Sequence, residues 1–156
     1  MQWHYKPFTA LNTQELYDIL ALRQSVFVLE QKCLYQDLDY ADQDALHLML
    51  YQNKDLACYL RFFAPKESHS VPASFGRVVV HPSHRGAGLA KIAIQKILAI
   101  MDKDYAHQPL VISAQAYLIK FYTDFGFTVQ GNPYDEDGIM HVKMIRRTAA
   151  TSITDE

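Results

Sequence analysis

The residues of this sequence that are best suited to binding or catalysis are one arginine and two glycines that follow a valine-rich run. The valines occupy residues 78–80, and Arg85, Gly86 and Gly88 come shortly after them. Apolar residues then recur at helical spacing, so the sequence predicts a strand that leads through a loop into a helix. The free amides and the dipole of such a helix start attract anions, and an arginine fork matches phosphate oxygens. We therefore predict a pyrophosphate site at residues 85–90, called the glycine loop below.

The spacing within the glycine loop excludes two common nucleotide sites. A nucleoside triphosphate loop requires Lys-Ser or Lys-Thr after its last glycine, where Leu89 and Ala90 stand here. A dinucleotide fingerprint requires three glycines, and only two are present. The remaining pattern, Arg-x-x-Gly-x-Ala, resembles the coenzyme A pyrophosphate loop of GNAT-superfamily acyltransferases. This resemblance implies that acetyl-CoA is held by Arg85, Gly86, Ala87, Gly88, Leu89 and Ala90.

An aromatic block further along the chain has the same resemblance. Phe121-Tyr122 follows an apolar run, and Gly126 is placed to close the intervening helix. The block is similar to the second GNAT signature, which implies that Tyr122 lies at the coenzyme sulfur and protonates the leaving thiolate. A phenol has a reference pKa of about 10, so it can act as an acid at neutral pH. The coenzyme arm is implied to contact Gln115, Tyr122 and the backbone of Val78, Val79 and Val80, which also polarises the thioester carbonyl.

The N-terminal half narrows the resemblance to one branch of the superfamily. Its patterns are Arg23-x-x-Val-Phe-Val-x-Glu30-Gln and then Cys33-x-Tyr-Gln-Asp-x-Asp39. Both are similar to the ElaA-like branch, which implies a reaction class and no particular substrate.

The acceptor side of the reaction is less well defined. Many relatives carry a glutamate on or near the valine strand, but residues 74–77 supply no carboxylate. His141 and His47 are the candidate catalytic bases, because the unperturbed pKa of an imidazole, about 6.5, suits proton transfer at neutral pH. Each could equally be structural, and a carboxylate, a base acting through water, or no protein base are open alternatives. We expect the acceptor pocket to involve Arg23, Glu30 and Asp137.

Three further features bear on the chemistry. The acidic residues Asp37, Asp39, Asp42 and Asp44 could attract a cationic amine or form a solvated loop. The histidines show no paired metal spacing, and His81 and His84 are expected to face solvent, so no metal is predicted. Cys33 has no histidine near it in sequence, which favours direct transfer over an acyl-enzyme.

Length and composition limit the number of domains, the partners and the cellular location that we expect. The 156 residues predict a single domain over residues 1–147 with a polar tail at 148–156. A formal net charge of −2 argues against nucleic acid. No apolar run approaches the ~20 residues of a membrane span, and two cysteines favour a reducing cytoplasm. We expect a monomer or a homodimer.

The order of the expected elements indicates the fold that positions these residues. A strand near residues 3–8, a helix capped by Asn12 and Glu15, and a hairpin around Asn53-Lys54 come first. The valine strand, the helix at 89–101, a strand at 110–113, a short helix at 117–125 and two final strands complete the chain. This order predicts an α/β (α+β) fold with a mixed central sheet of about six to seven strands and helices on both faces. The GNAT acyl-CoA N-acyltransferase fold has this order.

The leading hypothesis is an acetyl-CoA-dependent N-acetyltransferase that transfers its acetyl group directly to a primary amine of a small molecule or a peptide. Two alternatives are a non-catalytic acyl-CoA-binding module of the same fold and another acyl-CoA-dependent acyltransferase, such as an acyl-homoserine lactone synthase.

Overall fold

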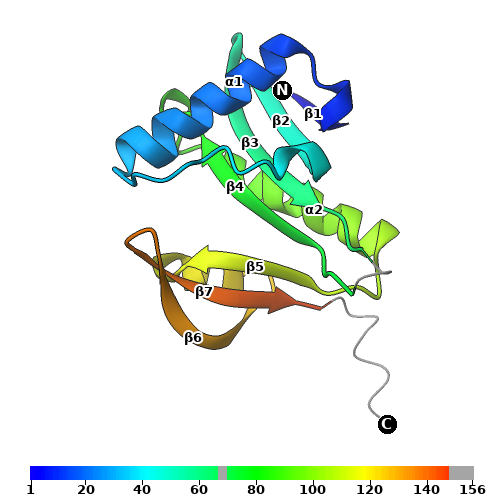
Figure 1. The fold of residues 1–156 in the computed structure, drawn as a ribbon. Coiled ribbons are helices and arrows are strands. Elements are labelled where there is room, and N and C mark those ends of the chain that lie inside the picture. The colour runs from blue at the N-terminus through cyan, green and yellow to red at the C-terminus, as the bar shows by residue number, and fades with distance from the viewer. Residues whose placement is uncertain (67–69, 148–156) are drawn as a thin grey trace. The chain divides into compact units, whose positions relative to one another are not determined.

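The computed structural model describes residues 1–66 and 70–147, and the predicted polar tail at 148–156 lies outside the described residues. Within that range the chain forms seven strands and the mixed α/β architecture that was predicted. Their hydrogen bonds make a four-stranded sheet, β1-β2-β3-β4, and a three-stranded sheet, β5-β7-β6 (Figure 1). The chain divides into two compact units, of which the first comprises residues 1–63 and 75–97. The prediction of a single domain stays a prediction.

The first unit contains the four-stranded sheet. Its strands are β1 (Gln2–Pro7), β2 (Leu46–Gln52), β3 (Asp55–Phe63) and β4 (Ser74–Val80). β2 pairs antiparallel with β1 on one side and with β3 on the other. Asn53 and Lys54 join β2 to β3 with φ of 51° and 70°, as a two-residue hairpin turn requires, and this confirms the predicted hairpin. β4 is the last strand of its sheet, so one of its edges has no partner strand there.

Helix α1 (Thr13–Arg23) begins at the predicted cap. Asn12 Oδ1 accepts a hydrogen bond from the Glu15 amide at 2.7 Å, and Asn12 Nδ2 donates to Glu15 Oε1 at 2.8 Å. The helix goes on as a π-helical segment, Gln24–Glu30. Its apolar stripe, which includes Ile19, Leu22 and Val26, packs into one core with Met49, Tyr59 and Val79 of the sheet.

Helix α2 (Leu89–Asp104) begins in the first unit and ends in the second. Its N-terminal half lies behind the four-stranded sheet in Figure 1, and α1 lies in front, so helices cover both faces as predicted. The Lys96 ammonium lies 5.5 Å from the centre of the Trp3 ring, a cation–π distance. Residues 81–88 join the end of β4 to the start of α2.

The second unit contains β5 (Leu110–Gln115), β6 (Thr128–Glu136) and β7 (Ile139–Arg146). β7 is central and pairs antiparallel with both neighbours. The short helix α3 (Ile119–Thr123) follows a single 3₁₀ turn, Ala116–Leu118. Gly126 ends this helical region with φ of 92°, and the Phe127 amide donates to the Tyr122 carbonyl at 3.3 Å, so the predicted helix stop is confirmed.

Candidate active site

The glycine loop has the geometry of an anion site. Gly86 and Gly88 have φ of 89° and 73°, a region that glycine enters without strain. The Ile92 amide donates to the Gly88 carbonyl at 3.2 Å, so Gly88 occupies the N-cap position of α2. Because glycine has no side chain to cap the helix, the amides of the first turn, from Leu89 to Lys91, are left without a helical acceptor. A Cβ built on either glycine would meet no atom of the described chain within 4 Å, so the space over the loop is open.

Arg85 lies at the start of the glycine loop and is held at three points. Its Nη1 and Nη2 donate to Glu30 Oε1 and Oε2 at 2.6 Å and 2.8 Å, and its Nε donates to the Val80 carbonyl at 3.2 Å. The hydrogen bond from Arg85 lowers the pKa of Glu30, and the same bond raises the pKa of Arg85. About two-fifths of each side chain is exposed, so the pair lies at the surface. Sequence reasoning placed Glu30 in the acceptor pocket; the structure places it against the predicted phosphate ligand.

β4 contains a backbone irregularity that the sequence did not predict. Arg77 has φ of 52° in the middle of the strand, a conformation that costs a non-glycine residue about 1 kcal/mol or more. Its guanidinium donates from Nε to Asp37 Oδ1 at 2.8 Å and lies 5.6 Å from the centre of the Tyr35 ring. These contacts hold the strained residue in place, directly before the valines that are expected to contact the coenzyme arm.

Arg23 is a structural residue, and its prediction as an acceptor contact is wrong. Its side chain is fully buried, with 0 % exposed. Its Nε donates to Asp37 Oδ2 at 2.9 Å and its Nη1 to Asp42 Oδ1 at 2.6 Å. A guanidinium with no exposed surface cannot touch a substrate, whereas it can compensate two buried carboxylates.

The acidic loop is not free to attract an amine, because Asp37, Asp39 and Asp42 are all paired with arginines. Arg61 donates to Asp39 Oδ2 at 2.6 Å and to Asp42 Oδ1 at 2.9 Å. The hydrogen bond from Arg61 holds the pKa of Asp39 well below its usual range. Burial raises the pKa of Asp42, but its bonds to Arg23 and Arg61 outweigh burial and lower it. Asp37 and Asp42 are buried, whereas Asp39 and Asp44 are exposed to solvent.

His47 has no nitrogen available for catalysis. Its Nε2 lies 2.9 Å from the Asp42 carbonyl, which can only accept, so Nε2 carries the proton. Its Nδ1 then accepts from the Tyr59 hydroxyl at 2.7 Å. Burial lowers the pKa of His47 and keeps the ring neutral, with 1 % of the residue exposed. The prediction of His47 as a catalytic base is therefore wrong, since its single lone pair is used in the core.

Tyr122 lies in α3 with its ring among aromatic neighbours. The ring centres of Phe121 and Phe127 are 5.1 Å and 5.8 Å away, both in edge-to-face geometry. Burial raises the pKa of Tyr122 to about 12, so the phenol stays protonated at neutral pH. Full proton transfer from this phenol to an alkyl thiolate, whose conjugate acid has a pKa of about 8.5, would be uphill by ~5 kcal/mol. The residue is therefore suited to donating a hydrogen bond to a thiolate.

His141 lies in a polar cluster on the second sheet. Its Nδ1 lies 2.8 Å from the Ile139 carbonyl, so Nδ1 carries the proton and Nε2 keeps its lone pair. That Nε2 is 3.6 Å from Glu136 Oε2, and the Tyr134 ring stacks on the imidazole. The Ser113 hydroxyl bonds to Glu136 at 3.2 Å and also to the Tyr134 hydroxyl.

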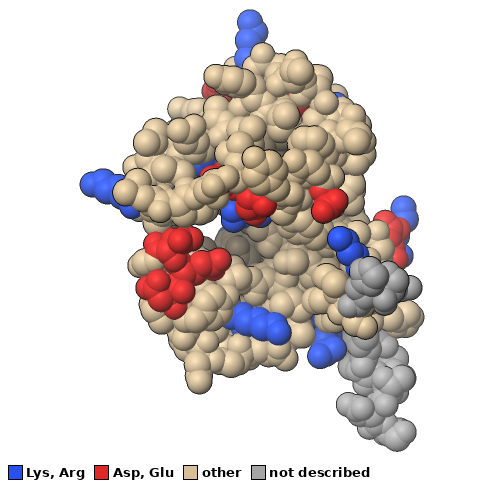
Figure 2. Space-filling model, in the orientation of Figure 1, with Lys and Arg blue, Asp and Glu red and all other residues tan. Residues whose placement is uncertain are grey.

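The β5–β7 register links this cluster to Gln115, which is the strand partner of His141. Two residues predicted to belong to one site are thus brought together. Asp137 and Gly138 form the turn between β6 and β7, with φ of 52° and 84°. Asp135, Glu136 and Asp137 are exposed, and Figure 2 shows acidic side chains gathered over this hairpin. Ser113 and Tyr134 carry no motif in the sequence, and only the strand register reveals them.

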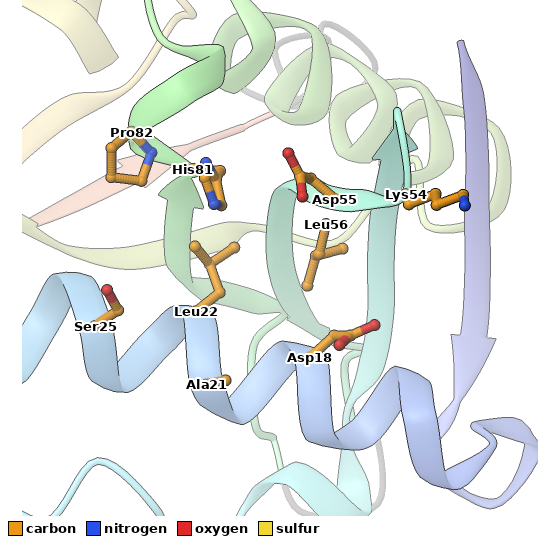
Figure 3. Close-up of a pocket in the computed structure, with 9 residues that line it drawn as sticks. All are labelled: Asp18, Ala21, Leu22, Ser25, Lys54, Asp55, Leu56, His81 and Pro82. Carbon is orange, nitrogen blue, oxygen red and sulfur yellow. The ribbon is translucent and has the colours of Figure 1, made fainter.

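A cavity of about 490 Å³ lies in the first unit between α1 and the β2–β3 turn (Figure 3). Its polar lining includes Asp18, Ser25 and Lys54, and Leu22 and Leu56 form part of its apolar wall. The residues that line it do not include the glycine loop. No described helix is both long and apolar enough to cross a membrane.

Comparison with known proteins identifies the family. The model of the GNAT acetyltransferase domain matches residues 12–148. The UPF0039 protein sll0451 of Synechocystis is 39 % identical over 94 % of this chain and 96 % of its own length. The crystal structure of an acyl-CoA N-acyltransferase from Pseudomonas aeruginosa has a TM-score of 0.87 and 37 % identity, covering 93 % of this chain and 98 % of that one. Escherichia coli ElaA has a TM-score of 0.86 and 34 % identity, covering 94 % and 99 %. The chain therefore belongs to the GNAT acetyltransferase family, in its ElaA-like branch, and is an acyltransferase.

Proposed function

We propose that this protein is an acetyl-CoA-dependent N-acetyltransferase that transfers its acetyl group directly to a primary amine. The observation that carries the proposal is the glycine loop, whose uncapped helix start and two left-handed glycines offer backbone amides to a pyrophosphate. Proteins of the GNAT fold family use acyl-CoA donors, and the family model is that of an acetyltransferase. These facts support acetyl-CoA as the donor.

On the donor side, the free edge of β4 supplies main-chain groups to the pantetheine arm. The Val80 carbonyl is taken by Arg85, so the amides of residues 78–80 are the groups proposed to contact the arm and polarise the thioester carbonyl. Val79 packs its side chain into the α1 core, which fixes this part of the strand. The proposed coenzyme contacts are Val78, Val79, Val80, Arg85, Gly86, Ala87, Gly88, Leu89, Ala90, Gln115 and Tyr122.

On the acceptor side, His141 is the proposed base. Its Nε2 lone pair is available because Nδ1 is committed to a backbone carbonyl. The carboxylates of Asp135, Glu136 and Asp137 favour a cationic amine, which must lose one proton before it can attack. The amine nitrogen then forms a bond to the thioester carbon, its second proton passes to Nε2, and the carbon–sulfur bond breaks.

The leaving thiolate is stabilised by Tyr122 in this proposal. With its pKa raised to about 12, the phenol donates a hydrogen bond without giving up its proton. An acyl-enzyme is disfavoured because both cysteines are buried, and burial raises the pKa of Cys58 to about 12. Transfer therefore passes through a ternary complex of acetyl-CoA, amine and enzyme. The two free thiols also support the expected reducing, cytoplasmic setting.

The experiment that tests this function is a thiol-release assay with acetyl-CoA and a library of small amines and peptide amines, run on the wild type and on Tyr122→Phe. We expect turnover with at least one amine class and a loss of about 10- to 100-fold in kcat for the variant, the value of a hydrogen bond to a charged group. Tyr117→Phe is the matched control, because that phenol is exposed and precedes α3.

Turnover that is unchanged in Tyr122→Phe would contradict the role given to this phenol. Binding of acetyl-CoA without turnover on any amine would instead favour the non-catalytic coenzyme-binding module.

A further inference from the structure

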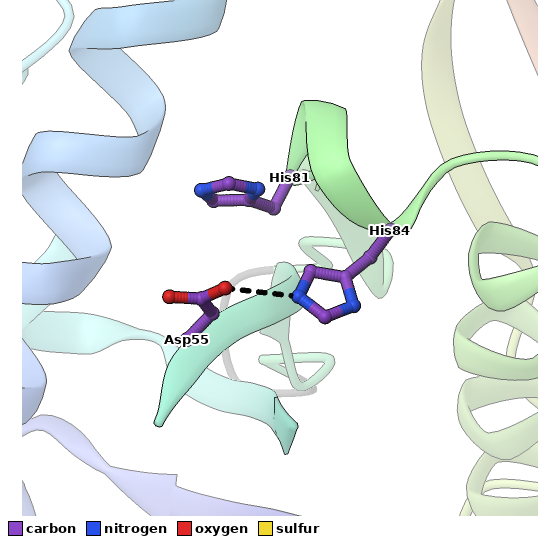
Figure 4. Close-up of side chains that lie close together, drawn as sticks. All are labelled: Asp55, His81 and His84. Carbon is purple, nitrogen blue, oxygen red and sulfur yellow. Dashed lines mark hydrogen bonds and ion pairs between the residues drawn. The ribbon is translucent and has the colours of Figure 1, made fainter. Parts of the chain in front are cut away.

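Asp55, His81 and His84 form a cluster in the first unit that the acyl-transfer chemistry does not use. One ligand atom from each side chain lies within 4.8 Å of the others. His84 Nε2 is 3.1 Å from Asp55 Oδ2, and the two imidazole rings meet edge to face at 5.5 Å between centres. Figure 4 shows His81 and Asp55 side by side, with His84 bonded to the same carboxylate. The expectation that both histidines face solvent is wrong for His84, whose side chain is only 13 % exposed.

The backbone holds these three residues in place independently of any ligand. Asp55 is the first residue of β3, and His81 directly follows β4. The His81 amide donates to the Ala57 carbonyl at 2.8 Å, which ties the end of β4 to β3. The His84 amide donates to the His81 carbonyl at 2.9 Å, which closes the 3₁₀ turn between the two histidines. A donor set fixed by a sheet and a tight turn loses little entropy when it binds an ion.

The donor set selects a class of ion. Two imidazole nitrogens and one carboxylate oxygen suit zinc and its neighbours among the divalent transition metals. Magnesium and calcium prefer oxygen ligands only, so they are poor candidates. Three protein ligands leave a fourth position open, as in sites that keep a water or a small ligand.

We propose that Asp55, His81 and His84 bind one divalent transition metal ion of the zinc class. The ion takes the place of the proton that His84 Nε2 donates to the Asp55 carboxylate, and the neutral ring then carries this proton on Nδ1. Coordination by His81 costs one exposed hydrogen bond, because Nδ1 uses the lone pair of the neutral ring to accept from the Ser83 amide at 3.1 Å.

The surroundings leave room for the open position. Asp55 and His81 both line the cavity of about 490 Å³ beside α1 (Figure 3), so a metal-bound water would point into solvent-accessible space. Asp18 lines the same cavity and adds a second negative charge near the ion. His84 directly precedes Arg85, so the ion would tie the start of the glycine loop to β3.

The test is calorimetric titration of the untagged, chelator-treated full chain with zinc chloride. We expect one equivalent bound, and an affinity at least about tenfold weaker in His84→Ala and in Asp55→Asn. Asp55→Asn keeps an oxygen that can accept from His84, so it tests the site even where His84→Ala is unstable. His107→Ala is the control, because His107 is an exposed histidine outside the cluster.

Thermal unfolding gives an independent readout of the same site. A saturating zinc concentration should raise the Tm of the wild type and of His107→Ala by more than that of Asp55→Asn, because stabilisation by a ligand falls as its affinity for the folded state falls. Equal zinc affinity in the wild type and in both cluster variants would overturn the proposal, as would the absence of binding at micromolar zinc.

Discussion

Arg85 and Glu30 form a two-point ion pair beside the glycine loop, with distances of 2.6 Å and 2.8 Å. Phosphate oxygens recognise the same guanidinium fork as a carboxylate does. In the proposed complex, Glu30 therefore competes with the coenzyme for Arg85, and its negative charge repels the pyrophosphate. This residue was predicted to face the acceptor, and its pairing was not foreseen because it joins positions 55 residues apart.

Glu30→Gln should bind acetyl-CoA more tightly than the wild type. The neutral amide removes a competitor for Arg85 and a charge that repels the pyrophosphate, so we expect a roughly fivefold gain in affinity. Calorimetry on the wild type, Glu30→Gln and Arg85→Ala measures this, with Asp102→Asn as the control because Asp102 forms an exposed pair with Arg146. Weaker binding in Glu30→Gln would show that the intact pair, and not the free arginine, is what the coenzyme requires.

His141→Asn should lower kcat by about 100-fold or more, the contribution of a positioned base. The loss should not depend on how much of the free amine is deprotonated, because His141 takes only the second proton in this scheme. Glu136→Gln should lose less, since its carboxylate lies 3.6 Å from His141 Nε2 and does not take the proton in this scheme. Steady-state rates across a pH series measure both variants. A His141→Asn enzyme with wild-type kcat at neutral pH would exclude this imidazole as the base.

At the scale of elements, three arginines from three elements converge on one loop. Arg23 from α1, Arg61 from β3 and Arg77 from β4 bind the carboxylates of Asp37, Asp39 and Asp42. Such a network contributes little over an apolar core, but removing one partner leaves a buried charge uncompensated. Through its bonds to Arg77, the loop also holds the strained residue of β4 in place.

The network should make the protein acid-sensitive. The pKa values of Asp39 and Asp42 are lowered in the folded state, so the stabilisation they give is complete above their unfolded pKa of about 3.9. It is then lost as the pH falls toward the folded values, and the free energy of unfolding should decline between about pH 5 and pH 3. Urea unfolding at a series of pH values measures the slope, which should be shallower in Asp39→Asn.

Asp44→Asn is the matched control for this series. Asp44 belongs to the same loop, is exposed, and has no ion pair among the described residues. The control should keep the wild-type pH dependence. An identical slope in Asp39→Asn and in the wild type would contradict the stabilising role of the arginine–aspartate network.

At the scale of the whole molecule, the sequence predicted the local features and missed the long-range ones. The capping box at Asn12, the Asn53-Lys54 turn and the Gly126 helix stop each depend on a few neighbouring residues, and all three are present. The acidic loop was predicted wrongly because its carboxylates pair with three arginines from distant positions in the sequence. His47 was misjudged because a tautomer depends on partners, Tyr59 and Asp42, that only the fold brings near.

The candidate site also contains one part that neighbouring residues determine and one part that long-range contacts determine. The glycine loop is a contiguous motif, and its left-handed glycines and helix start have the expected geometry. The acceptor cluster around His141 is assembled by strand register, so Ser113 and Tyr134 could not be found without it.

The central claim is that acetyl-CoA binds through the amides of the glycine loop, and amide chemical shifts of the ¹⁵N-labelled protein test it most directly. Titration with acetyl-CoA should give saturable shifts at Gly86, Ala87, Gly88, Leu89 and Ala90, because their N–H groups exchange water for phosphate oxygens. Arg85→Ala should need a higher acetyl-CoA concentration for the same shifts. Saturable shifts elsewhere in the protein, with these five amides unmoved, would contradict the account.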